Sequence, residues 1–192
     1  MKITHTNHTK RELPKEVELK VQRVESSVWE MFKKHHYMSQ VMNKGAKCFL
    51  FTWDGQPIGF FGILNQTFKG CNKYDHRGSR LVVLPEFQGL GFSKKILDFV
   101  GGVVKSLGGT LYTKERHDKL ARYQMKSPKW EPTAYNGKYR HNVEDRKSKN
   151  RLHRVSYCFK YVGEPIYGYE YLLNPIKELR KNKSSYLHRQ ED

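Results

Sequence analysis

The spacing of apolar residues predicts short strands that alternate with a few helices. Residues 17–24 alternate apolar and polar side chains, a pattern typical of a strand with one buried face. A short helix is expected at 26–36, where two serines precede aromatic residues that share one helical face. The apolar runs 48–53 and 57–64 flank an Asp-Gly pair, and this arrangement predicts a β-hairpin.

The second half of the chain continues this alternation. A polar loop is expected at 65–79, and Pro85 should end the buried strand that follows it. Two adjacent glycines weaken the next helix, because each costs about 1 kcal/mol of helix stability. The order of elements suits one α/β or α+β domain. The elements expected here are strand 81–84, helix 95–104, strand 110–113, helix 118–125, and two aromatic strands at 155–162 and 166–172.

Length and composition indicate one domain with basic appendages. The 192 residues fit one domain better than two, and 37% hydrophobic residues are enough to bury a core. We expect an N-terminal arm at 1–14 and a domain at 15–175. A basic insertion at 136–154 interrupts that domain, and a basic tail follows at 176–192.

Features that the sequence lacks narrow the possible classes. It has no run of about 18 apolar residues, so no transmembrane helix is predicted, and its first residues lack the apolar segment of a secretory signal. The three cysteines lie far apart and form no Cys-x-x-Cys pair. Neither a disulfide framework nor a zinc site is therefore indicated. We expect a reduced, cytoplasmic protein without a bound metal.

The net charge changes this picture most. The chain carries 36 Lys and Arg against 19 Asp and Glu, a formal net charge of +17. A surplus of this size attracts polyanions. Nucleic acid is the first partner that it suggests, followed by a phosphate-rich cofactor or an acidic protein. The alternative is that the basic surface only keeps the protein in solution.

The junction between the strand at 81–84 and the next helix suggests a phosphate-binding loop. Gly89 and Gly91 allow the backbone to approach a ligand closely. The helix that follows directs free N–H groups and the positive end of its dipole at the loop, and Ser93 adds a hydroxyl group. A Walker loop is excluded because no Gly-Lys-Ser/Thr follows. A Rossmann fingerprint fits poorly, since three strands precede the loop.

Residues 83–93, Val-Leu-Pro-Glu-Phe-Gln-Gly-Leu-Gly-Phe-Ser, resemble the coenzyme A motif of the GNAT superfamily, Val-x-Pro-x-x-Arg/Gln-x-x-Gly-x-Gly/Ala. Gln88 and Gly91 match that motif, and Ser93 departs from its last position. The resemblance implies a GNAT fold of the α+β class, with a mixed, mostly antiparallel sheet of six to seven strands and about four helices. It also implies an N-acyltransferase that uses acetyl-CoA or another acyl-CoA. The cofactor would contact Leu81, Val82, Val83, Gln88, Gly89, Leu90, Gly91, Phe92 and Ser93.

A narrower resemblance links the chain to GNAT domains fused to ABC-type ATPases and to stand-alone phage and bacterial relatives. It rests on the Trp-x-x-Phe pattern at 29–32, the strand 80–85, Trp130 and the segment 154–163. The His-Tyr pair at 36–37 is also similar to one in the Mom-like proteins of phages, which modify adenine in DNA. These likenesses imply a bacterial or phage-infected host cytosol.

Four residues are candidates for the chemistry of acyl transfer: His36, Tyr37, Arg80 and Tyr123. A histidine or a tyrosine can move the proton of the attacking amine. The alternative for His36 and Tyr37 is packing or capping, and the alternative for Tyr123 is a place on an amphipathic helix. Arg80 needs an anionic ligand or a structural carboxylate, such as Asp75 or Glu86, because it begins a buried strand.

The acceptor of the acyl group is predicted from charge. Basic residues interleaved with tyrosines in the insertion could hold phosphates and stack on bases. The sequence leaves three hypotheses: transfer to DNA or tRNA, transfer to a protein lysine or small amine, and binding without catalysis. A solvated, flexible loop is the alternative for the insertion itself. The residues expected to bind nucleic acid are Arg140, Arg146, Lys147, Lys149, Arg151 and Arg154.

Overall fold

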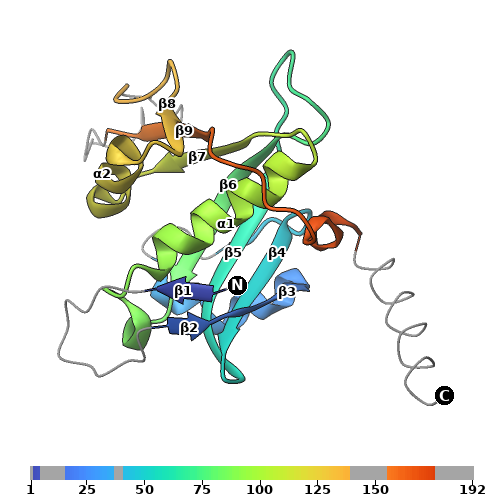
Figure 1. Cartoon of the computed structure of the whole chain (residues 1–192), viewed down its shortest axis with the longest axis vertical. Helices are drawn as coiled ribbons and strands as arrows, with labels where there is room; N and C mark the ends of the chain where they lie inside the picture. Colours follow the sequence, from blue (N-terminus) through green and yellow to red (C-terminus); the bar gives the residue numbers. More distant parts are fainter. Residues whose placement is uncertain (1, 5–15, 37–40, 139–154, 176–192) are drawn as a thin grey trace.

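A seven-stranded mixed sheet forms the centre of the molecule, in the order β3-β4-β5-β6-β7-β9-β8 (Figure 1). The computed structural model describes residues 2–4, 16–36, 41–138 and 155–175. Neighbouring strands are antiparallel except β6 and β7, which are parallel. The sheet confirms the predicted α+β class and strand number. Its strands are β3 (Lys20–Val24), β4 (Lys47–Trp53), β5 (Gln56–Asn65), β6 (His76–Val83), β7 (Leu111–Glu115), β8 (Trp130–Pro132) and β9 (Tyr157–Tyr161).

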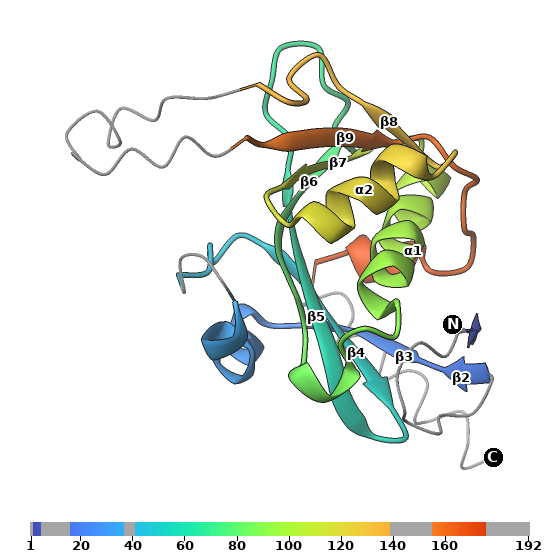
Figure 2. The same cartoon turned by 90° about the vertical axis from the view of Figure 1, so that its left-hand side faces the viewer.

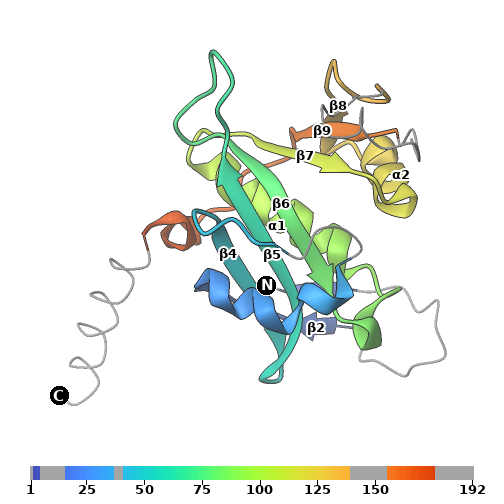
Figure 3. The ribbon, with the colours of Figure 1, turned by 180° about the vertical axis from the view of Figure 1, so that it is seen from behind.

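Helical segments cover both faces of the sheet. α1 (Phe92–Ser106) crosses one face, and α2 (Asp118–Lys126) packs beside it against β7 and β8 (Figure 2). The opposite face of β4 and β5 carries two 3₁₀ turns, η1 (Ser26–Met31) and η2 (Lys33–His35) (Figure 3). No helix among the described residues is long and apolar enough to cross a membrane.

Four shorter elements complete the described chain. β1 (Lys2–Thr4) pairs with β2 (Glu16–Glu18) as a separate two-stranded sheet. η3 (Pro85–Phe87) links β6 to α1, and η5 (Glu170–Leu173) places two leucines in the core under α1. The N-terminal segment therefore pairs with the domain at residues that the sequence assigned to a loose arm.

The two faces of the sheet bury separate cores. The larger core lies under α1, where the rings of Phe51 and Phe99 meet edge to face. The smaller core lies under η1 and η2, where Trp29 and Phe32 pack against Phe60. Aromatic pairs of this kind add to the stabilisation that buried area alone supplies. β4 and β5 are apolar on both faces because each face meets a core.

Several predicted elements differ from those observed. The segment 26–36 forms 3₁₀ turns, and β6 begins at His76, inside the predicted loop. β8 was not predicted, since three residues carry too little pattern. The strand expected at 166–172 is wrong, because Ile166 donates its backbone N–H to the Gly102 carbonyl and the chain then turns into η5. Its apolar residues serve packing against α1.

The two adjacent glycines within α1 allow Tyr161 and Ile166 to pack closely against the helix. A Cβ on Gly101 would lie 2.6 Å from the Tyr161 ring, and one on Gly102 would lie 2.6 Å from Ile166. Both glycines are buried, and the helix continues through them. Their cost in helix propensity is offset by the close approach of the segment after β9.

Candidate active site

The loop between β6 and α1 has the conformation that its glycines allow. β6 ends at Val83, η3 turns the chain, and α1 begins at Phe92. Gly89 and Gly91 have φ values of 84° and 82°. This left-handed region costs other residues roughly 1 kcal/mol or more. Nothing would lie within 4 Å of a Cβ on Gly91, so open space adjoins the loop.

Five consecutive backbone amides in this loop are unpaired. Among the described residues, none of the N–H groups of 89–93 donates to a backbone or side-chain acceptor. They precede the first turn of a fifteen-residue helix, whose dipole places partial positive charge at the same point. Free backbone donors at the start of a helix commonly bind anions, so this loop is a candidate anion site.

The strand before the loop presents an open backbone edge. The Leu84 amide donates to the Ile58 carbonyl at 2.9 Å, so Val82 forms the hydrogen-bonded pair with β5. The amides and carbonyls of Leu81 and Val83 therefore point away from β5. The Gln88 side chain closes the end of this edge, since its Nε2 donates to the Val83 carbonyl at 2.9 Å.

The open edge exists because β6 and β7 separate. The two strands pair only at His76 with Leu111 and at Arg77 with Tyr112 (Figure 1). The pairing of β6 with β5 shifts between Gly62 and Ile63, which leaves one extra residue in β6. A bulge of this kind bends a strand and redirects its side chains. The result is an open strand edge that runs from the bulge to the loop.

Glu115 at the end of β7 is a candidate that the sequence analysis missed. It lies on the same face as Leu111 and Thr113, which is the face that α1 and α2 cover. Its side chain is half-buried, and desolvation raises the pKa of its carboxyl group to about 7. It forms no hydrogen bond or ion pair with any described residue. The alternation of side chains along β7 could have assigned Glu115 to the face under α1 and α2. It could not have shown that β6 and β7 separate beside it.

Arg80 lies beside the bulge, on the face that carries η1 and η2. Its guanidinium donates to the carbonyls of Ser79, at 2.8 Å, and Val41, at 2.9 Å. Its Nε is buried and has no partner among the described residues. The carboxylate of Asp75 instead accepts the amides of Asn72 and Thr110. The structure thus gives Arg80 no ion pair with a described carboxylate.

The predicted His-Tyr pair is only partly described. His36 follows η2, and its ring meets Trp29 edge to face at 5.4 Å between centroids. It therefore lies over the smaller core and on the same side of the sheet as Arg80. Tyr37 lies outside the described residues, and so do the six basic residues of the insertion that were expected to bind nucleic acid.

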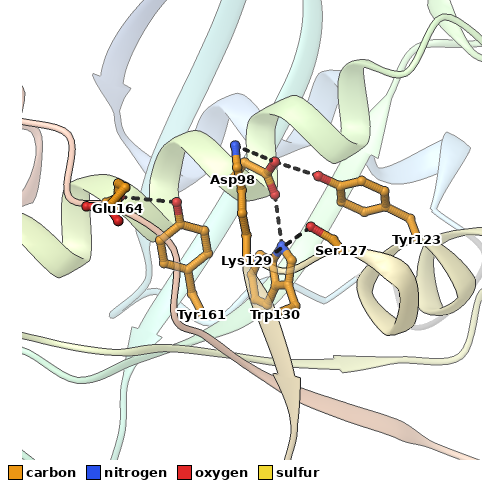
Figure 4. A network of polar contacts seen from close by, with 7 residues as sticks. All are labelled: Asp98, Tyr123, Ser127, Lys129, Trp130, Tyr161 and Glu164. Atoms are coloured by element: carbon orange, nitrogen blue, oxygen red, sulfur yellow. Dashed lines mark hydrogen bonds and ion pairs between the residues drawn. The ribbon is translucent and has the colours of Figure 1, made fainter.

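Tyr123 belongs to a buried network around Asp98 of α1 (Figure 4). The Tyr123 hydroxyl donates to Asp98 Oδ2 at 2.5 Å, and Trp130 Nε1 donates to Oδ1 at 2.8 Å. Lys129 completes the carboxylate's contacts at 3.4 Å. Desolvation and the Asp98 carboxylate raise the pKa of Tyr123. The structure places this hydroxyl against Asp98, where its proton stabilises a buried charge.

Two further observations bound the chemistry of the site. Within the described part of the chain, no three His, Cys, Asp or Glu side chains gather in a way that could hold a metal ion. None of the described cysteines forms a disulfide, and burial raises the pKa of Cys48 to about 11. The site therefore consists of backbone amides, an open strand edge and a carboxyl group with a pKa near neutrality.

Comparisons with known proteins bear on the fold. No protein-family model matches the chain, and no curated protein does. Solved structures do match. The IAA acetyltransferase from Bacillus cereus is 14% identical with a TM-score of 0.56, over 76% of this chain and 100% of that one.

Two further structures agree with this match. The ribosomal-protein-S18-alanine N-acetyltransferase from Escherichia coli is 13% identical with a TM-score of 0.53, over 79% of this chain and 97% of that one. A GNAT family acetyltransferase from Elizabethkingia anophelis with acetyl-CoA bound is 12% identical with a TM-score of 0.54, over 74% of this chain and 96% of that one. The chain therefore has the fold that these GNAT-type acetyltransferases share.

Proposed function

We propose that the protein is an N-acyltransferase that transfers an acyl group, such as acetyl, from coenzyme A to an amine. The observation that carries this proposal is the run of five unpaired amides at 89–93, directly beside the open edge of β6. These amides would hold the pyrophosphate, and the edge at Leu81 and Val83 would pair with the pantetheine arm. A solved structure of the same fold holds acetyl-CoA, which supports this cofactor.

The residues beside the open edge of β6 suggest how the transfer proceeds. Bound acetyl-CoA supplies a thioester whose carbonyl carbon accepts the amine nitrogen as the carbon–sulfur bond breaks. Backbone amides at the open edge of β6 polarise the carbonyl. Glu115, whose carboxylate is available near neutral pH, accepts the proton that the amine loses. Water at this open edge protonates the leaving thiolate.

We further propose that the acceptor is a nucleic acid. The net charge of +17 supports this choice, because it attracts polyanions over long distances. Arg80 supports it too, since a half-buried guanidinium without an ion-paired carboxylate among the described residues can bind a phosphate of the acceptor. The resemblance of the His-Tyr pair to Mom-like DNA-modification proteins agrees with it. A protein lysine or a small amine is the second candidate.

One experiment tests cofactor and acceptor together. The full chain is incubated with isotope-labelled acetyl-CoA in four separate reactions. Each reaction contains one acceptor: DNA, tRNA, a lysine-rich protein or spermidine. Mass spectrometry of the digested products should find the label on a nucleoside. Label on lysine or spermidine alone would overturn the nucleic-acid acceptor. Absence of coenzyme A binding by calorimetry would overturn the enzyme itself.

A matched pair of variants makes the calorimetry specific to the loop. Gly91→Val places a side chain in the open space and strains a residue at φ 82°. It should weaken coenzyme A binding at least tenfold. Gly70→Val has φ 84° and equally open space, but lies in the loop before β6. It should leave coenzyme A binding unchanged.

A further inference from the structure

Among the described helices, none covers one face of the second half of the sheet. α1 and α2 lie on the face that holds Leu111 and Thr113, and η1 and η2 lie over β4 and β5 (Figure 3). Strand register places Arg77, Tyr112 and Lys160 next to one another on the opposite face. Among the described elements, no helix packs on that part of the sheet.

The side chains of this uncovered face are basic and aromatic. Arg77 and Lys114 are exposed, and Lys160 is bonded to Glu131 at 2.8 Å across β8 and β9. The exposed ring of Phe68, from the loop before β6, stands against Tyr112 at 90° with centroids 5.4 Å apart. We call the surface formed by Phe68, Arg77, Tyr112 and Lys114 the open face.

The open face has two properties that single-stranded nucleic acid requires. Its two exposed cations lie on adjacent strands, so they can contact neighbouring phosphates. Phe68 has 46% of its side-chain surface exposed, although burial would be favourable for a ring of this size. An exposed ring held edge-on by a second ring is a rigid platform on which a base can stack.

The open face lies near the part of the sheet where β6 and β7 separate. It lies on the same side of the sheet as Arg80, beyond the point at which β6 and β7 separate. Lys138 and Ser156 form an isolated antiparallel β-bridge, and in the sequence these two residues flank the basic segment 139–154. A nucleic-acid strand bound on the open face would therefore lie close to the open edge of β6.

We propose that the open face binds single-stranded nucleic acid and directs one nucleotide toward the open edge of β6. This inference rests on the proposed nucleic-acid acceptor and names its form. A duplex would offer phosphates but no free base faces for Phe68. An acidic protein would offer carboxylates, and it would not need an aromatic platform.

Fluorescence anisotropy of a labelled 20-nucleotide oligothymidine tests this proposal with the full chain. Arg77→Ala with Lys114→Ala should raise the Kd at least tenfold, and should lower the slope of log Kd against log salt by about 1.4. Lys105→Ala with Lys119→Ala is the matched control, since both lysines are exposed and belong to α1 and the α2 region. This control should leave the slope nearly unchanged.

The aromatic platform has its own variants. Phe68→Ala should raise the Kd roughly fivefold to a hundredfold, and Phe68→Trp should restore binding. Equal weakening by the control pair, no effect of Phe68→Ala, or tighter binding of a duplex of the same length would each overturn the proposal. Binding of poly-glutamate in place of the oligonucleotide would overturn it as well.

Coenzyme A calorimetry on the same variants separates the two proposals. The open-face variants should bind coenzyme A as the unaltered chain does, because none of the four residues belongs to the loop. If the unaltered chain fails to bind coenzyme A but binds oligothymidine through Phe68, the acyltransferase proposal falls and the open face stands.

Discussion

The two halves of the sheet are built differently, although one helix serves both. β3 to β6 form a continuous antiparallel ladder with an aromatic core on each face. β7, β9 and β8 form a smaller ladder that joins the first at only two residue pairs. The first half holds the loop that we propose binds phosphate, here called the phosphate loop, and the second holds Glu115.

α1 joins the two halves of the sheet. It begins directly after the loop 88–91, and its middle carries Asp98, which accepts hydrogen bonds from Tyr123 of α2 and Trp130 of β8. We call these contacts of Asp98 the anchor. The loop and the second half of the sheet are therefore fixed to the same helix.

Removal of the anchor should cause the largest change, a loss in the free energy of unfolding. Asp98→Ala removes the acceptor of two buried donors, and we expect it to destabilise the fold by roughly 3 kcal/mol. Urea unfolding followed by circular dichroism measures this loss. Lys129→Ala removes only the half-exposed partner at 3.4 Å and should change stability by less than about 0.5 kcal/mol. Equal losses in both variants would contradict the role of the anchor.

Acid should have the second-largest effect, because it should weaken the pairing of β6 with β7, which we call the joint between the two halves. His76 pairs with Leu111 at this joint, donates from Nδ1 to the Tyr74 carbonyl at 2.5 Å and accepts from Lys47 at 3.1 Å. Burial, with the charge of Lys47, lowers the pKa of His76 to about 4. The unfolded chain therefore binds more protons between pH 6.5 and 4, and this contribution to stability is lost as pH falls through that range.

The expected loss from His76 is about 3 kcal/mol between these limits. It is measured as the difference between the unaltered chain and His76→Asn, whose amide can still donate to the Tyr74 carbonyl. The variant should lack this part of the pH dependence, while acids that titrate in both proteins cancel. Identical pH profiles for the two proteins would show that protonation of His76 does not control the joint.

Glu115 tests the chemistry of the second half. If it is the base, kcat/KM for the acceptor rises with pH through about 7, since the carboxylate must be ionised. Glu115→Gln should lower kcat/KM about a hundredfold and remove this rise, while coenzyme A affinity stays unchanged. Glu131→Gln, which alters an exposed carboxylate in the same half, is the control. A rise that persists in Glu115→Gln would assign the base elsewhere.

The sequence predicted the first half of the molecule better than the second, for a physical reason. The phosphate loop and its strand occupy one contiguous stretch, so local pattern and glycine placement carry their geometry. The hairpin was equally local, because Asp54 and Gly55 adopt the positive φ angles of its turn. Each of these features depends on neighbours along the chain.

The second half depends on contacts between distant residues. Glu115 becomes a candidate only because β6 and β7 separate, and Asp98 meets partners 25 and 32 residues further along the chain. The segment at 166–172 has the aromatic alternation of a strand, yet Gly102 draws it onto α1. No local pattern distinguishes that packing from a strand.

Tyr123 gives the smallest expected effect and separates two roles for one hydroxyl. Tyr123→Phe removes one of the donors to Asp98 and should cost about 1 kcal/mol of stability. Its kcat should fall less than about threefold if the hydroxyl only stabilises the anchor. A fall of a hundredfold with unchanged stability would instead make Tyr123 the acid that protonates the thiolate. Met125→Ala, at an exposed position near the end of the same helix, controls for small shifts of α2.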